Sequence, residues 1–120
     1  MEFHAKYVST GSAVGGDYYQ AIFEAEEDTD DLDANGPYLL IQRDFEMSYG
    51  RKRYIETHDE RYCGHFPLRR IEFTPEKLAI ELDRPKDNVI YVSCRLTPSE
   101  FEVASHVMKI ISGEIEPDPE

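Results

Sequence analysis

Apolar and polar side chains alternate along most of the chain. Apolar residues occupy every second position over residues 17–26, and residues 77–83 repeat the pattern. This period of two is typical of a β-strand with one buried face. Residues 38–45 and 88–96 contain continuous apolar runs instead, which indicates more central strands. Weaker strand patterns occur at residues 3–9, 53–58, 62–66 and 68–74.

Turn-forming residues separate these segments. Four stretches between the apolar runs contain residues that favour turn dihedrals. They are Gly15-Gly16-Asp17, Asn35-Gly36-Pro37, Thr74-Pro75-Glu76 and residues 84–88. Short connections of this kind join antiparallel neighbours. The pattern therefore predicts an antiparallel meander.

One segment has a helical period. Thr97-Pro98-Ser99-Glu100 combines a capping hydroxyl, a proline in the first turn and a carboxylate three residues after the cap. The apolar residues that follow are spaced three or four apart, and Gly113 is a helix stop. The stripe consists of Phe101, Ala104, Val107, Met108 and Ile111. We predict an amphipathic helix over residues 97–112, packed on one face of the sheet.

Length and composition favour a single unit. The chain has 120 residues, of which 40% are hydrophobic, including 8 Tyr and 6 Phe, and this is enough apolar material for one core. The sequence predicts one α+β domain over residues 1–113. Residues 114–120 are acidic and interrupted by Pro117 and Pro119, which predicts a flexible tail.

The balance of charged residues indicates which classes of partner the chain can bind. Thirteen Lys and Arg stand against twenty-five Asp and Glu, so the net charge is -12. Such a surface repels a phosphate backbone, which argues against nucleic acid and favours a basic protein. No apolar run is long enough to span a membrane, and Met1–His4 does not resemble a secretory signal. With two cysteines as well, we expect a cytoplasmic, reduced protein.

The acidic charge is concentrated in residues 24–33, which contain seven carboxylates and no basic residue. The stretch Asp31-Leu32-Asp33-Ala34-Asn35-Gly36 matches the first half of a calcium loop. The twelfth position, which needs a bidentate Glu, is Gln42, and the flanking segments are strand-like. The sequence therefore favours an acidic hairpin loop over a calcium site.

Two other clusters suggest chemistry. His58, Cys63 and His65 carry zinc-ligand atoms, with Asp59 nearby, although Cys63 and His65 could equally be a core thiol and a rim imidazole. A small-molecule or metal-binding domain built on this region is the alternative function. The glycine-rich stretch 10–16 lacks the lysine of a phosphate loop, and no Ser or Cys lies in a recognised catalytic motif. We therefore predict a protein that is not an enzyme and needs no cofactor.

The middle of the chain carries three short motifs. They are Tyr38-Leu39-Leu40-Ile41-Gln42-Arg43, then Tyr54-Ile55-Glu56 with Asp59-Glu60, then Tyr62-Cys63-Gly64, and a strand pair ending at residues 78–82 follows. Together they resemble the immunity protein 10 family of bacterial polymorphic toxin systems, over roughly residues 36–112. Glu60 stands where the family has Gln, Cys63 stands where it has Gly, and the spacer 46–53 is short.

The resemblance implies a small cytoplasmic immunity protein that neutralises a cognate toxin by binding it. The negative charge agrees with this, since an acidic inhibitor associates faster with a basic toxin. We predict two groups of contact residues. The first is the acidic loop and the second is the region of the motifs, where Glu56 and Tyr62 could instead serve to order the sheet. The predicted contacts are Glu26, Asp28, Asp30, Asp31, Asp33, Glu56, Asp59, Glu60 and Tyr62.

Overall fold

The computed structural model describes residues 1–13, 15–25, 36–45 and 52–117. They form one domain, an eight-stranded sheet with one C-terminal helix, in agreement with the predicted α+β class. The strands are β1 (Glu2–His4), β2 (Tyr7–Ser12), β3 (Tyr18–Glu24), β4 (Tyr38–Asp44), β5 (Lys52–Thr57), β6 (Gly64–Thr74), β7 (Lys77–Leu82) and β8 (Val89–Ser93). A 3-10 turn, η1 (Glu60–Tyr62), precedes β6, and helix α1 spans Pro98–Ser112.

The sheet is mixed, which corrects the predicted meander. Strands β2 to β8 follow one another in sequence order, and each pairs antiparallel with the next. Strand β1 instead lies parallel to β8, with Phe3 opposite Val92. The alternation in residues 3–9 predicted a single strand. Residues 3–9 instead contain the end of β1 and the start of β2, and these two strands pair with different neighbours.

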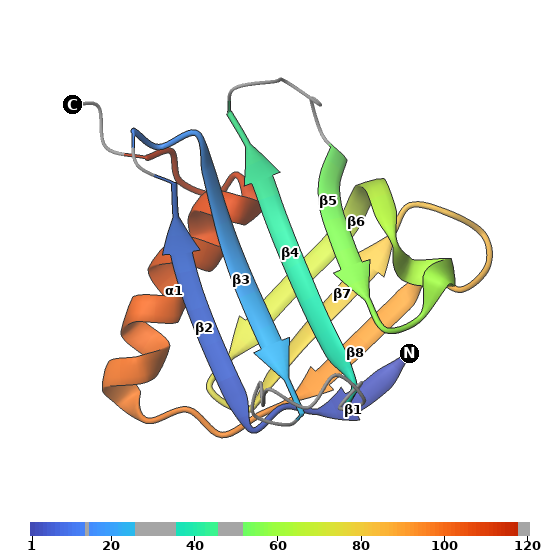
Figure 1. Ribbon diagram of the computed structural model, residues 1–120, viewed down its shortest axis with the longest axis horizontal. Coiled ribbons are helices and arrows are strands. Elements are labelled where there is room, and N and C mark those ends of the chain that lie inside the picture. Colours follow the sequence, from blue (N-terminus) through green and yellow to red (C-terminus); the bar gives the residue numbers. More distant parts are fainter. Residues whose placement is uncertain (14, 26–35, 46–51, 118–120) are drawn as a thin grey trace.

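The sheet curls until its two edges meet at one end. Strands β1 and β2 lie at opposite edges of the sheet, yet they are joined by Ala5 and Lys6 alone. The Ala5 N–H donates to the Ser93 carbonyl of β8 (2.8 Å), and the Lys6 N–H donates to the Glu24 carbonyl of β3 (2.9 Å). The curled sheet therefore has two layers, a front layer of β2–β5 and a back layer of β6–β8 (Figure 1).

Strand β6 belongs to both layers. Its first residues pair with β5, from Gly64 opposite Ile55 to Pro67 opposite Lys52, and residues 68–74 pair with β7. Two consecutive residues, Arg69 and Arg70, lie against Glu81, and a bulge of this kind bends a strand. The alternation predicted two strands, 62–66 and 68–74. The chain instead forms one bent strand that passes through Pro67.

Helix α1 begins and ends as its sequence predicts. The Thr97 side chain accepts from the Glu100 N–H while the Glu100 carboxylate accepts from the Thr97 N–H, which completes the capping box. Gly113 ends the helix in the left-handed region, with φ of 88°. Ala104, Met108 and Ile111 of the predicted stripe are buried, and Phe101 packs on Phe73 of β6 with ring centroids 5.1 Å apart.

Two arginines of the front layer hold the last turn of the helix. The Arg43 Nη1 donates to the Ile110 carbonyl (2.8 Å), and the Arg53 Nε donates to the Ile111 carbonyl. Cations stabilise this end of a helix because its carbonyls are unpaired and the helix dipole is negative there. Arg53 is only 8% exposed, and its burial lowers the pKa of its guanidinium. Arg43 also pairs with Glu116 at 3.2 Å, in the segment predicted as a tail.

Candidate partner-binding face

No described helix lies on the outer face of strands β3, β4 and β5 (Figure 1). Alternate residues of these strands point into the core. Those that are fully buried include Ala21, Leu39, Ile41 and Ile55. The residues between them point outward, and we call this surface the front face. It consists of Tyr18, Gln20, Ile22, Glu24, Tyr38, Leu40, Gln42, Asp44, Lys52, Tyr54 and Glu56.

The centre of the front face combines apolar, phenolic and amide groups. Ile22, Leu40 and Glu56 lie side by side across three strands, and the next row holds Gln20, Gln42 and Tyr54. Most of these residues are half-buried by their neighbours. Aromatic residues are enriched in the cores of protein interfaces, whereas lysine and the acids are depleted there. The apolar and aromatic groups here are of types found at protein interfaces, whereas the carboxylate of Glu56 is a less common one.

Glu56 is held by two phenols. The Tyr38 hydroxyl of β4 donates to Glu56 Oε2 (3.2 Å), and the Tyr54 hydroxyl of β5 donates to Glu56 Oε1 (2.9 Å). Each carboxylate oxygen therefore accepts one neutral hydrogen bond. Glu56 takes part in none of the ion pairs between residues that the structure describes.

The carboxylate changes the acidity of both phenols. Burial raises the pKa of Tyr38 to about 12, and the negative charge of Glu56 adds to the shift. The pKa of Tyr54 is raised mainly because its hydroxyl donates to Glu56. Both hydroxyls are therefore protonated at neutral pH and act as donors.

The candidate metal ligands each have other contacts. The His58 ring packs edge-on against Phe3, and its Nδ1 accepts from the Tyr38 N–H (3.2 Å). The Cys63 Sγ donates to the Thr57 carbonyl (3.3 Å), and the His65 ring lies 5.2 Å from that of Tyr54. Among the described residues, no group of three or more His, Cys, Asp or Glu could hold a metal ion.

Asp59 and Glu60 lie at the corner after β5. Asp59 caps η1, and its carboxylate binds Arg61, with Oδ2 2.7 Å from Nη2. The hydrogen bonds from Arg61 lower the pKa of Asp59 to about 2. Glu60 is exposed in the first turn of η1. Asp59 is therefore paired with a cation, whereas no described residue forms an ion pair with Glu56.

Two parts of the predicted contact set are not on the front face as the structure describes it, Tyr62 and the acids of residues 26–33. Tyr62 is 4% exposed and belongs to the core, and the guanidinium of Arg84 lies 5.3 Å from its ring centroid. Its burial is compatible with the structural alternative that the sequence left open, and its role in partner contact stays a prediction. Glu26, Asp28, Asp30, Asp31 and Asp33 lie outside the described residues, as does the partial calcium motif at 31–35. The role of these loop acids stays a prediction.

The outer surface of β6, β7 and β8, which we call the back face, has a different charge pattern. Arg69 bridges Glu81 and Asp83 with two contacts of 2.9 Å, and Glu72 pairs with Arg70 (3.3 Å) and Lys77 (3.5 Å). Ala79 lies between Glu72 and Tyr91 in the register. The acids at the centre of this face are therefore neutralised by the chain itself.

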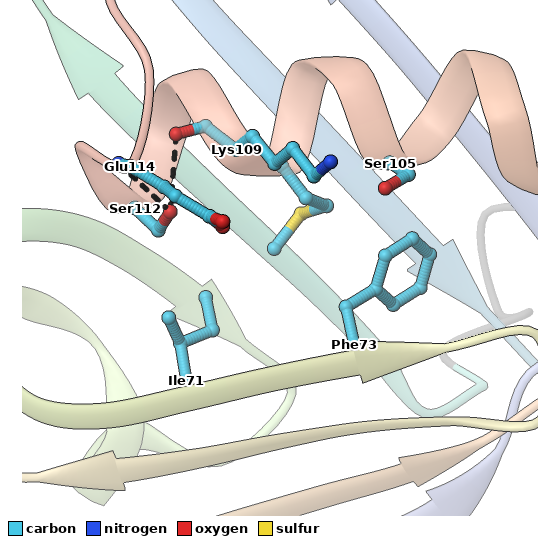
Figure 2. Close-up of a pocket in the computed structure, with 7 residues that line it drawn as sticks. Ile71, Phe73, Ser105, Lys109, Ser112 and Glu114 are labelled. Atoms are coloured by element: carbon cyan, nitrogen blue, oxygen red, sulfur yellow. Dashed lines mark hydrogen bonds between the residues drawn. The ribbon is translucent and has the colours of Figure 1, made fainter.

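A small hollow lies between β6 and α1 (Figure 2). Ile71, Phe73 and Met108 form its apolar part, and Lys109, Ser112 and Glu114 line it from the helix end. Its volume is about 80 Å³, whereas ligand clefts usually measure about 300–1,000 Å³. The hollow has room for a short side chain or a few water molecules.

Neither a family model nor a curated protein matches the chain. Within the described residues, no helix has the length and apolar character needed to cross a membrane. Further evidence on function therefore comes from the geometry of the surface.

The sequence named Glu56 as a contact but missed the residues around it. Tyr54 and Glu56 are two positions apart on a strand, so they share a face, and this signal was available from the alternation alone. Tyr38 lies on the neighbouring strand, next to Glu56 only because Leu40 is opposite Glu56 in the register. That register is a property of the folded sheet.

Proposed function

We propose that the protein is an immunity protein that binds and neutralises a basic toxin in the cytoplasm, without chemistry of its own. The observation that carries the proposal is the front face, a sheet surface that the described helix does not cover, with three acids, Glu24, Asp44 and Glu56, against one described cation, Lys52. Apolar and aromatic groups at its centre supply area that a partner can bury, which is the usual source of binding energy at an interface.

The net charge supports the same partner. At -12 the chain attracts a basic protein at long range and repels nucleic acid and anionic membrane surfaces. The resemblance of the three motifs to the immunity protein 10 family agrees with this function. The motif residues Tyr38, Leu40, Gln42, Tyr54 and Glu56 all point outward on the front face.

The test begins with the neighbouring reading frame, which the proposal expects to encode a large secreted protein with a variable C-terminal toxin domain, and continues with co-expression of that domain and the chain. Cells that produce the toxin domain alone should stop growing, and the chain should restore growth and co-purify with the toxin. A control protein of similar size and charge should not protect, because charge alone does not make a specific interface. Continued growth arrest in the presence of well-folded chain would contradict the proposal.

A further inference from the structure

The centre of the front face holds a carboxylate, Glu56, that forms no ion pair with the described residues of the chain. On the back face, arginine or lysine side chains lie within 3.5 Å of Glu72, Glu81 and Asp83. Glu56 is half-buried on the front face, and the structure shows two phenols as its hydrogen-bond donors. A carboxylate has room for about four hydrogen bonds, so the described residues leave two acceptor positions unfilled.

The surroundings favour one kind of cation. A guanidinium is planar, donates two parallel hydrogen bonds to a carboxylate and stacks on aromatic rings, whereas an ammonium group is a strongly hydrated point charge. Tyr38 and Tyr54 place rings on two sides of Glu56, and the ring of His65 lies against Tyr54. Aromatic faces attract cations, and Arg is the more frequent partner.

We propose that Glu56, between the phenols of Tyr38 and Tyr54, is the receptor for an arginine side chain of the partner protein. The inference rests on the proposed function and adds the chemical identity of the group that is recognised. The geometry supports it, because both phenols donate to Glu56 and the carboxylate is the acceptor at the centre of the site. Leu40, opposite Glu56 in the register, offers an apolar surface beside the aliphatic part of the arginine.

The first experiment needs no toxin. A capped Gly-Arg-Gly peptide and its lysine counterpart are titrated to tens of millimolar into the labelled full chain, and NMR signals of every residue are followed. We expect the signals of Tyr38, Tyr54 and Glu56 to shift more than those around Glu72, and to shift more with arginine than with lysine. An equal response at the two faces, or no preference for arginine, would overturn the inference.

Two matched variants complete the test. Glu56→Gln keeps the shape of the side chain and a hydrogen-bond acceptor, and Glu72→Gln removes one carboxylate from the back face, where cations of the chain surround it. We expect Glu56→Gln to abolish the local arginine response and to weaken the toxin complex by about tenfold or more, while Glu72→Gln changes neither. Equal effects of the two variants would contradict the inference. Tyr54→Phe keeps the ring, so it should retain part of the response.

The two proposals fail in different ways. If the wild-type chain binds no toxin but the arginine peptide shifts the Glu56 region, the immunity function is wrong and the site is a guanidinium receptor for another protein. If the chain binds toxin and Glu56→Gln binds it equally well, the function stands and the arginine receptor is wrong.

Discussion

The two outer faces of the sheet differ in what surrounds their carboxylates. On the back face, Arg69 and Arg70 lie next to each other at the bulge in β6 and neutralise acids of the same face. On the front face, Glu56 is held by the neutral donors Tyr38 and Tyr54. A carboxylate with an internal cation gains little from a second one, whereas Glu56 can still gain from a cation that a partner brings. This difference supports the proposal that the front face is the one that binds the partner.

The first prediction tests whether the two faces belong to one folding unit. Helix α1 contacts strands of both layers, and Met108 is 3% exposed between them. Met108→Ala should reduce the free energy of unfolding by about 2–5 kcal/mol, through lost apolar contacts and a cavity. Denaturant unfolding followed by NMR should show signals of the front and back faces disappearing together. Separate transitions for the two faces would show that they are independent units.

The second prediction separates stability from binding. Arg69 pairs with Glu81 and Asp83, but its side chain is 50% exposed, so solvent weakens these contacts. Arg69→Ala should lower the free energy of unfolding by at most about 1 kcal/mol, and less at high salt. Toxin binding should be unchanged. If Arg69→Ala weakens the toxin complex as much as a front-face variant does, the back face takes part in recognition.

The third prediction concerns high pH. The pKa of Tyr38 is raised from 10.0 to about 12, so the folded state favours the neutral phenol. Its contribution to stability is therefore complete below pH 10 and is lost as the pH rises through 12. An NMR titration of labelled tyrosine rings should show this late ionisation. Glu56→Gln should move the pKa of Tyr38 only part of the way back, because burial is the larger cause. A titration unaffected by Glu56→Gln would contradict the contact.

The fourth prediction concerns the acidic loop. Changing Asp28, Asp30, Asp31 and Asp33 together to Asn should slow association with the toxin at low salt and leave dissociation nearly unchanged, because exposed charges act mainly through their summed field. The difference should shrink at 1 M salt, where the Debye length is about 3 Å. Stopped-flow measurements over a range of salt concentrations provide the check. A loss confined to dissociation would place the loop inside the interface instead.

The structural features that depend on residues close together in the sequence could be predicted from it. The capping box at Thr97 and the glycine at 113 defined the helix, because both act within one turn of the chain. The alternation gave the strands and their buried sides. The parallel pairing of β1 with β8 was missed, because it joins residues about ninety positions apart and depends on how the whole sheet curls. The bend of β6 at its bulge was missed for a different reason, because a break in the alternation looks the same for one bent strand and for two separate strands.

The candidate site divides in the same way. Glu56 was predicted from a motif, and the alternation is enough to place Tyr54 on the same face. The partner strand that brings Tyr38 to Glu56 follows from the register of β4 on β5, which short-range patterns do not determine. Tyr62 belongs to the same motif region as Glu56, but the turn η1 directs its ring into the core.

The most direct test of the account compares one cation placed on each face. Leu40 and Ala79 both point outward near the middle of a layer, Leu40 on the front face and Ala79 on the back face. Isothermal titration of the toxin domain into Leu40→Arg should show a loss of affinity of about 100-fold or more, while Ala79→Arg should stay within about threefold of wild type. Melting temperatures confirm that both variants are folded. Full affinity in Leu40→Arg, with the loss in Ala79→Arg, would contradict the central claim that the front face binds the partner.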